Sequence, residues 1–332
     1  MTVRNESRLA VREGEAERLV LRFAPDAGTL ELATPLASAA LAVPAFAAGL
    51  EAAFGWHPEH ERLRVDLAGR AADPVVQALL REGLLLGEGG TLHALAAQAM
   101  QRPDPWLAAR HAPFPQVPVL SHGRRHPRRP PKPQGTVYAR YLPRLGRTFS
   151  LRAATLADDL DRLHRWMNDP RIAAFWGEEG DLDKHRRYLD DLIADPHMLP
   201  LVGSFDGEAF AYFEIYWAKE NRLAPFYDAW DYDRGWHVLV GEERFSGRDY
   251  IGAWLPSLMH YLFLDDPRTQ RIVGEPAASH VRQIRNLETS GFARLSTFDF
   301  PHKRAALVML LRERFFGDRL WLPADLRMPA PE

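Results

Sequence analysis

The 332-residue sequence contains no cysteine, which excludes disulfide bonds, thiolate metal sites and a cysteine nucleophile. This absence is compatible with a reducing cytoplasm. The formal net charge is only −2, so we expect no overall attraction to nucleic acid or to an anionic membrane. Hydrophobic residues make up 46% and charged residues 26% of the chain, which is ordinary for a globular protein with a full core.

The sequence also lacks stretches that are typical of leaders and membrane spans. Its charged N-terminus has no apolar segment like that of a signal peptide, and no run approaches the roughly 18 apolar residues of a spanning helix. We therefore expect a cytoplasmic protein, monomeric or homodimeric, that acts on a small molecule. Nucleic acid, membrane and metal are not among its expected partners.

Residues 121–135, SHGRRHPRRPPKPQG, mark the clearest change in composition. The segment is rich in proline and basic residues and has no other apolar side chain, which favours an extended, polyproline-like connector. A nucleic-acid patch is the alternative, but interleaved aromatic residues are missing. We predict an N-terminal accessory domain (1–120), a linker (121–137) and a C-terminal domain (138–332).

The N-terminal region combines strand-like and helical patterns. RLVLRFA, TLELAT and RLRVDLA are predicted to be strands, whereas DPVVQALLREGLLL and TLHALAAQAMQRPDPWL are predicted to be helical. His57 and His60 have a spacing that two zinc ligands can have, but no further ligands stand nearby. A solvated loop or helix end is the favoured interpretation of this pair.

The C-terminal region predicts elements in the order β-α-α-β-β-β-α-β-α-β-β. Asp169-Pro170 is predicted to end the first helix and Pro196 to close the second. Pro256 lies inside the third helical pattern, and because Gly252 stands four residues before it we expect a bend rather than a break. Gly291 is predicted to cap the last helix.

The stretch VLVGEERFSGRDYIGAWL, residues 238–255, places a Gly- and Arg-bearing turn between an apolar strand and a helix. Backbone N–H groups of such a turn, at the positive end of a helix, can hold a pyrophosphate. Arg244 and Arg248 add positive charge that a purely structural turn does not need. The carboxylate of Asp249 is a candidate cap for the first-turn amides of the helix.

This strand, turn and helix resemble the acyl-CoA-binding core of the GNAT acetyltransferases, whose turn reads Arg/Gln-x-x-Gly-x-Gly/Ala. Residues 244–249 match it, with Asp249 at the final Gly/Ala position. SHVRQIRNLETSGF resembles the last core helix of the superfamily, with His280 at the usual Asn position. More narrowly, HRWMNDPRIAAFW, FEIYWAKE, GWHVLVGE, LPSLMHYLF and FPHKRAAL resemble the siderophore-pathway branch, which acylates hydroxylated amines such as N-hydroxylysine.

The resemblance covers about residues 145–322 and implies an α/β fold with a mixed central sheet and flanking helices. The N-terminal α/β domain is then a candidate degenerate copy of the same fold. Acyl-CoA, most simply acetyl-CoA, is the implied co-substrate. Its implied contacts are Val238, Leu239, Val240, Arg244, Phe245, Ser246, Gly247, Arg248, Asp249, His280 and Arg285.

For catalysis, the resemblance implies a histidine just before the acyl-CoA-binding strand and a carboxylate at the end of the next parallel strand, here His237 and Glu275. A hydroxylamine is largely uncharged near neutrality, and a histidine with a pKa near 6.5 can accept its proton. Amides at a strand bulge near Val238–Val240 would polarise the thioester carbonyl. The simpler alternatives are a strand-start histidine bonded to a backbone carbonyl and a solvated carboxylate.

Acceptor-side candidates lie in loops and strands that border the other half of the cleft in this fold. Phe175-Trp176 precede Glu178 and Glu179, and an exposed aromatic beside acids is typical of a ligand rim. A lysine-like acceptor would need a carboxylate and a cation, for which Asp228 and Lys303 are candidates. The full set is Trp176, Glu214, Tyr216, Trp217, Tyr227, Asp228 and Lys303.

The predicted function is transfer of an acyl group, most simply acetyl, from acyl-CoA to the hydroxylamine nitrogen of an N-hydroxylated lysine or diamine. Two alternatives stay open at this point. One is acyl-CoA-dependent acetylation of another amine, such as an antibiotic or a protein N-terminus. The other is a catalytically silent fold that binds acyl-CoA as a sensor or scaffold.

Overall fold

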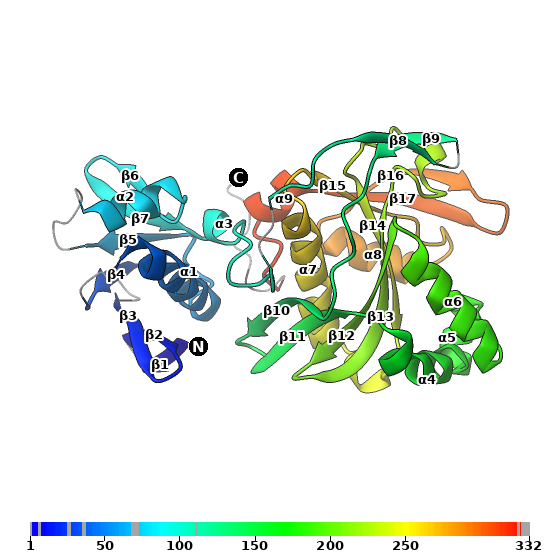
Figure 1. The fold of residues 1–332 in the computed structure, drawn as a ribbon, viewed down its shortest axis with the longest axis horizontal. Coiled ribbons are helices and arrows are strands. Elements are labelled where there is room, and N and C mark those ends of the chain that lie inside the picture. Colours follow the sequence, from blue (N-terminus) through cyan, green and yellow to red (C-terminus); the bar gives the residue numbers. More distant parts are fainter. Residues whose placement is uncertain are drawn as a thin grey trace. The chain divides into compact units, whose positions relative to one another are not determined.

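The structure, a computed structural model, describes residues 2–5, 8–24, 28–34, 38–67, 73–109, 112–121, 123–323 and 326. The chain forms two compact units (Figure 1). Unit 1 comprises residues 1–106 and 316–332, and unit 2 comprises residues 107–315. Each unit is built around its own sheet, and a third, two-stranded sheet lies within unit 2. These boundaries differ from the expected ones. Residues 107–137, expected in the N-terminal domain and the linker, belong to unit 2, and residues 316–332, expected in the C-terminal domain, belong to unit 1.

Unit 2 contains an eight-stranded sheet in the order β10-β11-β12-β13-β14-β15-β17-β16, in which only β14 and β15 pair in parallel. Its strands are β10 (Thr136–Leu142), β11 (Arg147–Ala153), β12 (Met198–Phe205), β13 (Glu208–Trp217), β14 (Arg234–Val240), β15 (Arg271–Gly274), β16 (Ala293–Asp299) and β17 (Arg304–Leu311). Its helices are α4 (Leu156–Met167), α5 (Pro170–Trp176), α6 (Leu182–Ala194), the 3-10 turns η2 (Ala224–Phe226) and η3 (Glu243–Phe245), α7 (Arg248–Asp265) and α8 (Val281–Thr289). Helix α9 (Arg312–Gly317) follows β17.

The helices of unit 2 cover both faces of this sheet, with α4, α5 and α6 on one face and α7 on the other (Figure 1). On the first face, Leu163 and Trp166 of α4 pack with Tyr212 and Leu239 of the sheet. On the second face, Trp254 of α7 packs against aromatic residues of β13 and β14. Because side chains alternate along a strand, each of these strands contributes to both layers.

Most of the predicted order of elements is confirmed, but helices α5 and α9 and strand β10 were missed. Asp169-Pro170 starts a helix, since the Asp169 side chain accepts a hydrogen bond from the Arg171 amide and Pro170 occupies the first turn of α5. An N-cap followed by proline is a start signal, so the prediction that α4 simply ends there was incomplete. Pro256 lies inside an unbroken α7, as expected.

Unit 1 contains a seven-stranded sheet in the order β1-β2-β3-β4-β5-β7-β6. Its elements are β1 (Thr2–Asn5), β2 (Arg8–Glu13), β3 (Ala16–Ala24), β4 (Thr29–Leu32), α1 (Ala39–Trp56), β5 (Arg62–Asp66), α2 (Pro74–Arg81), β6 (Leu86–Glu88), β7 (Thr91–Leu95) and α3 (Ala96–Ala99). Among the described strands of this sheet only β4 and β5 pair in parallel, and α1 lies between them in the sequence. Strands β6 and β7 form a hairpin, and β7 pairs with β5. The same pattern surrounds β14, α7 and β15, which supports the hypothesis of a degenerate copy.

Helix α1 is the core helix of unit 1. By length and composition it could also cross a membrane, with a mean hydropathy of 1.4, which the sequence analysis did not anticipate. Half of this 18-residue helix is buried within the fold. At Gly49 the helix approaches the sheet so closely that an added Cβ would lie 2.9 Å from Leu21 Cδ1.

Two further expectations for unit 1 can be compared with the structure. TLHAL forms strand β7 rather than helix, and only the four residues of α3 that follow it are helical, so the alternation of Leu92 and Ala94 decided the local structure. His57 ends α1, and its ring packs 4.2 Å from the ring of Phe23. Among the described residues no group of three or more His, Cys, Asp or Glu side chains could hold a metal ion.

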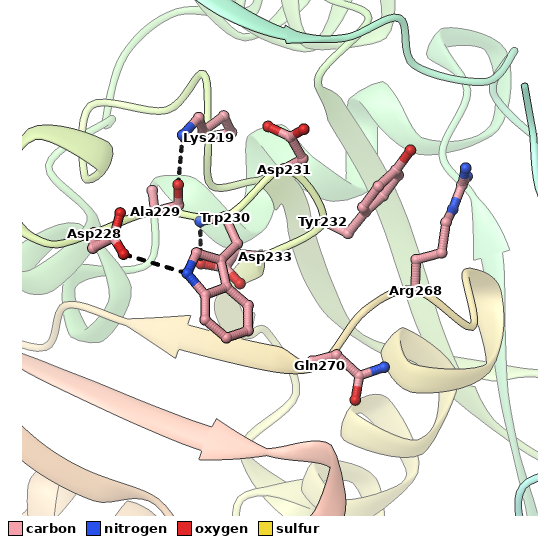
Figure 2. A pocket seen from close by; sticks show the side chains of 9 residues that line it. All are labelled: Lys219, Asp228, Ala229, Trp230, Asp231, Tyr232, Asp233, Arg268 and Gln270. Atoms are coloured by element: carbon pink, nitrogen blue, oxygen red, sulfur yellow. Dashed lines mark hydrogen bonds between the residues drawn. The ribbon is translucent and has the colours of Figure 1, made fainter. Parts of the chain in front are cut away.

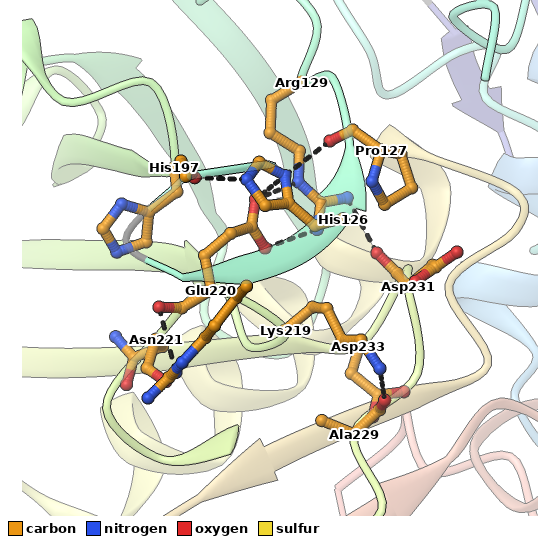
Figure 3. Close-up of polar contacts among 12 residues, drawn as sticks. His126, Pro127, Arg129, His197, Lys219, Glu220, Asn221, Ala229, Asp231 and Asp233 are labelled. Carbon is orange, nitrogen blue, oxygen red and sulfur yellow. Dashed lines mark hydrogen bonds and ion pairs between the residues drawn. The ribbon is translucent and has the colours of Figure 1, made fainter. Parts of the chain in front are cut away.

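The basic segment 121–135 lies within unit 2 and is held by buried contacts, so it is not a solvated connector. Strands β8 (Pro118–Ser121) and β9 (Arg124–Pro127) form a hairpin. Arg129, 7% exposed, binds the carboxylate of Glu220 through two hydrogen bonds of 2.5 Å, and the buried His126 lies 2.9 Å from the same group (Figure 3). Lys132 donates to two carbonyl oxygens at the end of α6. Charged groups are buried here because each one finds a partner.

Candidate functional site

The candidate site lies where β14 and β15 part. The two strands pair in parallel only at Arg234↔Ile272 and Gly235↔Val273. Two residues further along each strand stand His237, in the middle of β14, and Glu275, directly after β15. His237 is also paired across the sheet with Glu214 of β13. The three polar side chains that the sequence analysis assigned to two different roles are therefore brought together.

Both ring nitrogens of His237 meet a carboxylate. Nδ1 lies 3.1 Å from Glu214 Oε2, and Nε2 lies 2.9 Å from Glu275 Oε1. Neutral imidazole has only one N–H, whereas the imidazolium ion donates from both nitrogens. Two acceptors at hydrogen-bonding distance therefore favour the protonated ring. The alternative of a histidine bonded to a backbone carbonyl does not apply here.

The protonation state follows from burial and charge. The side chains of Glu214 and Glu275 are 7% and 1% exposed, and that of His237 is 27% exposed. Burial alone would lower the pKa of His237, but the charge of Glu275 and the hydrogen bonds with both carboxylates raise it to about 9. Burial alone would raise the pKa of Glu275, but the cationic ring holds it well below the usual value. The sequence analysis expected a His237 pKa near 6.5, but in the structure the raised pKa keeps the ring protonated at neutral pH.

A second layer of groups positions the two carboxylates. Tyr216 donates a 2.7 Å hydrogen bond to Glu275 Oε2, and the Tyr188 hydroxyl of α6 donates to Glu214 Oε1. Tyr216 can reach across β14 because residue 235 is glycine, where an added Cβ would lie 2.1 Å from the tyrosine ring. Tyr216 is completely buried, so its predicted acceptor-side role becomes one of holding Glu275.

The Gly- and Arg-bearing turn lies at the far end of β14. Phe245 is buried and anchors the turn against Phe205, whereas Arg244 and Arg248 are exposed. Arg244 pairs with Glu208. Ser246 Oγ donates to the Glu243 carbonyl at 2.5 Å, and Gly247 is the N-cap of α7 with no side-chain cap bond. The prediction that Asp249 caps α7 was therefore wrong, because it lies within the first turn.

The predicted bulge near Val238–Val240 lies directly after these residues. Strand β14 pairs with β13 without a register shift from Arg234 to Val240. The amides of Gly241 and Glu242 then both donate to the carbonyl of Phe210, at 2.8 and 3.1 Å, which is the pattern of a bulge at the end of the strand. Since the Gly241 amide points to β13, alternation turns the amides of Val238 and Val240 toward the open edge. Leu239 is buried against α4.

The remaining predicted contacts lie on α5 and α8. The indole of Trp176, at the end of α5, stands perpendicular to the His237 ring with 6.4 Å between centroids. Phe175 is 80% exposed, and its ring stacks on His280, the N-cap of α8, at 5.5 Å. Arg285 is exposed on α8. The structure thus places Trp176 beside His237, as a rim residue should be, and His280 beside an exposed aromatic ring.

Three acceptor-side candidates have no described contact with His237. Trp217 is buried between the guanidinium groups of Arg129 and Arg234, at 4.4 and 4.0 Å from its ring centroid. Asp228 accepts a 3.4 Å hydrogen bond from Trp230 and lines an open pocket of about 460 Å³ (Figure 2). The hydroxyl of Tyr227 donates to Asp233. Trp217 and Asp228 therefore belong to the surroundings of the 218–233 loop, whereas Tyr227 also packs in the apolar cluster that contains Tyr216 and lies close enough to Glu275 to interact with its charge.

Sequence reasoning missed two residues at the site, Tyr188 and Arg222. Tyr188 lies within an amphipathic helix, where an inward-facing tyrosine is indistinguishable from a core residue. Arg222 follows β13 in a loop, and its guanidinium lies 3.9 Å from Glu275 Oε1. The only signal for Arg222 is its place at the end of FEIYWAKENR, in the loop that follows an aromatic-rich strand.

Residues 155–300 match the acetyltransferase (GNAT) domain family. The chain contains a GNAT acetyltransferase domain. Its sequence is 46% identical over 192 residues to N(6)-hydroxylysine O-acetyltransferase of Escherichia coli, covering 58% of this chain and 61% of that protein. It is 48% identical over 206 residues to N(5)-hydroxyornithine:cis-anhydromevalonyl coenzyme A-N(5)-transacylase SIDF of Beauveria bassiana, covering 61% of this chain and 45% of that protein.

The matched part of the chain therefore spans between about half and two thirds of the length of these relatives. Among solved structures, an uncharacterised protein from Bacillus halodurans superposes with a TM-score of 0.53 and 26% identity. It covers 57% of this chain and 96% of that one. The predicted GNAT-like α/β fold is confirmed, and so is the resemblance to acyltransferases of the siderophore branch.

Proposed function

We propose that this chain transfers an acyl group, most simply acetyl, from acyl-CoA to the hydroxylamine nitrogen of an N-hydroxylated lysine, ornithine or diamine. The observation that carries the proposal is His237, held between two buried carboxylates where β14 and β15 part. The activities for which the relatives are named, hydroxylysine O-acetylation and hydroxyornithine N-acylation, support the acceptor class. The place of such an acyl-CoA-dependent reaction is the cytoplasm.

In this proposal, the acyl donor lies along the open edge of β14. The amides of Val238 and Val240 face that edge and can donate to the thioester carbonyl oxygen, stabilising the negative charge that forms during attack. The pyrophosphate would lie at the start of α7, where the first-turn amides have no side-chain cap and Arg248 adds charge. Unit 2 carries these groups, and unit 1 is assigned an accessory role.

His237 would act as an acid first and as a base second. The hydroxylamine nitrogen attacks the carbonyl carbon, a C–N bond forms, and the C–S bond breaks. The imidazolium gives one proton to the departing sulfur, and the neutral ring then takes the proton that the nitrogen loses, so that CoA thiol and a hydroxamate are released. Glu214 and Glu275 keep the ring in place and stabilise its charged form.

Two readings of one assay test the proposal. Purified full-length chain is incubated with acetyl-CoA and N6-hydroxylysine, CoA release is followed with a thiol reagent, and the hydroxamate is detected as its coloured ferric complex. Both signals are expected, in equal amounts. CoA release without the ferric complex would place the acyl group on oxygen, and release only with primary amines would favour another acceptor. CoA binding without release from any acyl-CoA would favour a silent fold.

A further inference from the structure

Two cations flank one aromatic ring beside Glu275. Arg222 lies in the loop between β13 and β14, and Lys303 lies in the hairpin between β16 and β17. The guanidinium carbon of Arg222 is 5.3 Å and the Nζ of Lys303 is 5.7 Å from the ring centroid of Phe300. Lys303 also donates a 2.8 Å hydrogen bond to the backbone carbonyl of Glu275. The chain has thus brought two like charges together at the catalytic pair.

The buried carboxylates do not balance these charges. His237, as an imidazolium, already neutralises one of the two carboxylates that hold it. Arg222 and Lys303 together exceed the remaining negative charge, so the cluster has a positive charge in excess. Arg222 is 52% exposed and lies 3.9 Å from Glu275 Oε1, which is beyond hydrogen-bonding distance. Its donors are therefore not committed to that carboxylate.

Burial lowers the pKa of Lys303, and the neighbouring Arg222 cation lowers it too, against the opposing effect of Glu275. The two cations therefore repel each other in the ligand-free site. A carboxylate between them would relieve this repulsion and would form charge-assisted hydrogen bonds with both. An ammonium group at the same place would instead meet like charges.

The place of the two cations in the fold identifies the substrate that they face. The loop of Arg222 joins β13 to β14 before Arg234, whereas the turn of residues 244–249 follows the other end of β14. The phosphates of an acyl-CoA belong at that turn, next to the start of α7. An anion at Arg222 and Lys303 is therefore part of the acceptor, which reaches His237 from the opposite end of the strand.

We propose that Arg222 and Lys303 form a subsite for the carboxylate of the acceptor. This inference rests on the proposed function and narrows it, because the acceptor is then an amino acid with an N-hydroxylated side chain rather than an N-hydroxylated diamine. Phe300, which is 7% exposed, forms the floor between the two cations. The acceptor's carboxylate binds here while its hydroxylamine end reaches His237.

The test compares three acceptors that differ only at the far end: N6-hydroxylysine, its α-carboxamide and N-hydroxycadaverine. Equilibrium binding to the full-length chain is measured by calorimetry, and turnover is measured by CoA release. The native chain is expected to bind N6-hydroxylysine about tenfold or more tightly than either analogue, since one charge-assisted pair contributes roughly that factor. R222Q and K303Q are each expected to reduce this affinity ratio toward one. In the turnover assay, each variant should raise the KM for N6-hydroxylysine and leave the KM for acyl-CoA unchanged.

R187Q is the matched control, because Arg187 is an exposed arginine of α6 outside the site, and it is expected to keep the native ratio. Equal binding of all three acceptors by the native chain, or an unchanged ratio in R222Q, would overturn the subsite. Binding decides this even if no acceptor is turned over. In that case the carboxylate preference would stand while the proposed acyl transfer would fail, so the two outcomes are distinguishable.

Discussion

Units 1 and 2 arrange their last strands in the same way, around one parallel pair with a long helix between its members. In unit 1 the pair β4–β5 stays in register for three residues, ending at Glu31↔Asp66. In unit 2 the pair β14–β15 ends after two residues, and His237 and Glu275 stand just beyond it. Both units share the topology. Among the described residues, only in unit 2 do a histidine and a carboxylate, His237 and Glu275, stand in contact where the two parallel strands separate.

The histidines of the two units sharpen this contrast. In unit 1 the distance from His57 Nδ1 to Glu59 Oε1 is 3.1 Å, the same as from His237 Nδ1 to Glu214 Oε2 in unit 2. Glu59 is 59% exposed, however, and Glu214 only 7%. Solvent screens an exposed pair so strongly that its contribution is typically about 0–1 kcal/mol. Burial, and not distance, is what makes the pair in unit 2 able to fix a proton.

The largest effect is expected from H237A. Removing a general acid–base group lowers the rate by typically about 10²–10⁴-fold, so kcat should fall to that extent while the affinity for CoA stays nearly unchanged. The change is measured by CoA release with N6-hydroxylysine and by calorimetry with CoA. H60A, which changes a histidine of unit 1, should keep kcat within about twofold. A native rate in H237A would remove the ring from the mechanism.

A large effect on stability is expected at the basic segment 121–135. R129L leaves Glu220 buried without its partner, and breaking a buried pair costs about 3–5 kcal/mol. The free energy of unfolding for the transition of unit 2, measured in urea, should fall by that amount. R128L, at an exposed neighbouring arginine, should change it by less than about 0.5 kcal/mol. Equal effects of both variants would mean that the segment is a solvated connector after all.

A smaller effect is expected from pH. The folded-state pKa of His237 is raised to about 9, above an unfolded value of about 6.5. The folded form therefore holds a proton that the unfolded form loses, and the resulting stabilisation is complete below pH 6.5 and lost as the pH rises through 9. The shift corresponds to about 3 kcal/mol. The difference between the native chain and H237Q in urea unfolding should shrink over this range, and a constant difference would contradict the raised pKa.

The smallest effect is expected at the turn before α7. Arg248 is exposed, so its contact with a phosphate would be partly screened, and R248Q should raise the KM for acyl-CoA about 3–10-fold at unchanged kcat. The increase should diminish at high salt, because the Debye length falls from about 10 Å at 0.1 M to about 3 Å at 1 M. R187Q is again the matched control. A reduced kcat with unchanged KM would assign Arg248 to a different task.

Much of the site could be predicted from the sequence because it follows from strand order. His237 lies within the first and Glu275 directly after the second of two consecutive strands joined by a helix, and such strands pair in parallel. The role of Glu214 could not be predicted, because its partner is chosen by the register between β13 and β14. The protonated state of His237 depends on the burial of two carboxylates, which no local pattern reveals.

The fold was predictable where periodicity was strong and uncertain where proline was ambiguous. The three strands β12 to β14 and the helix α7 were predicted correctly. The sequence predicted that a helix ends at Asp169-Pro170, but Asp169 is the N-cap of α5, which begins at Pro170. The segment 121–135 was expected to be an extended connector because of its composition, but its Arg129 is buried against Glu220, about 90 residues later in the chain. Long-range ion pairs of this kind cannot be derived from local sequence.

The central claim is that His237 is a cation held by Glu214 and Glu275 at neutral pH. Nitrogen NMR of the histidine-labelled full-length chain tests it directly, with the His237 signals assigned by their loss in H237Q. We predict that both ring nitrogens carry a proton at pH 7 and that the ring titrates near pH 9. A ring that is neutral at pH 7, with a titration at or below pH 6.5, would contradict the account.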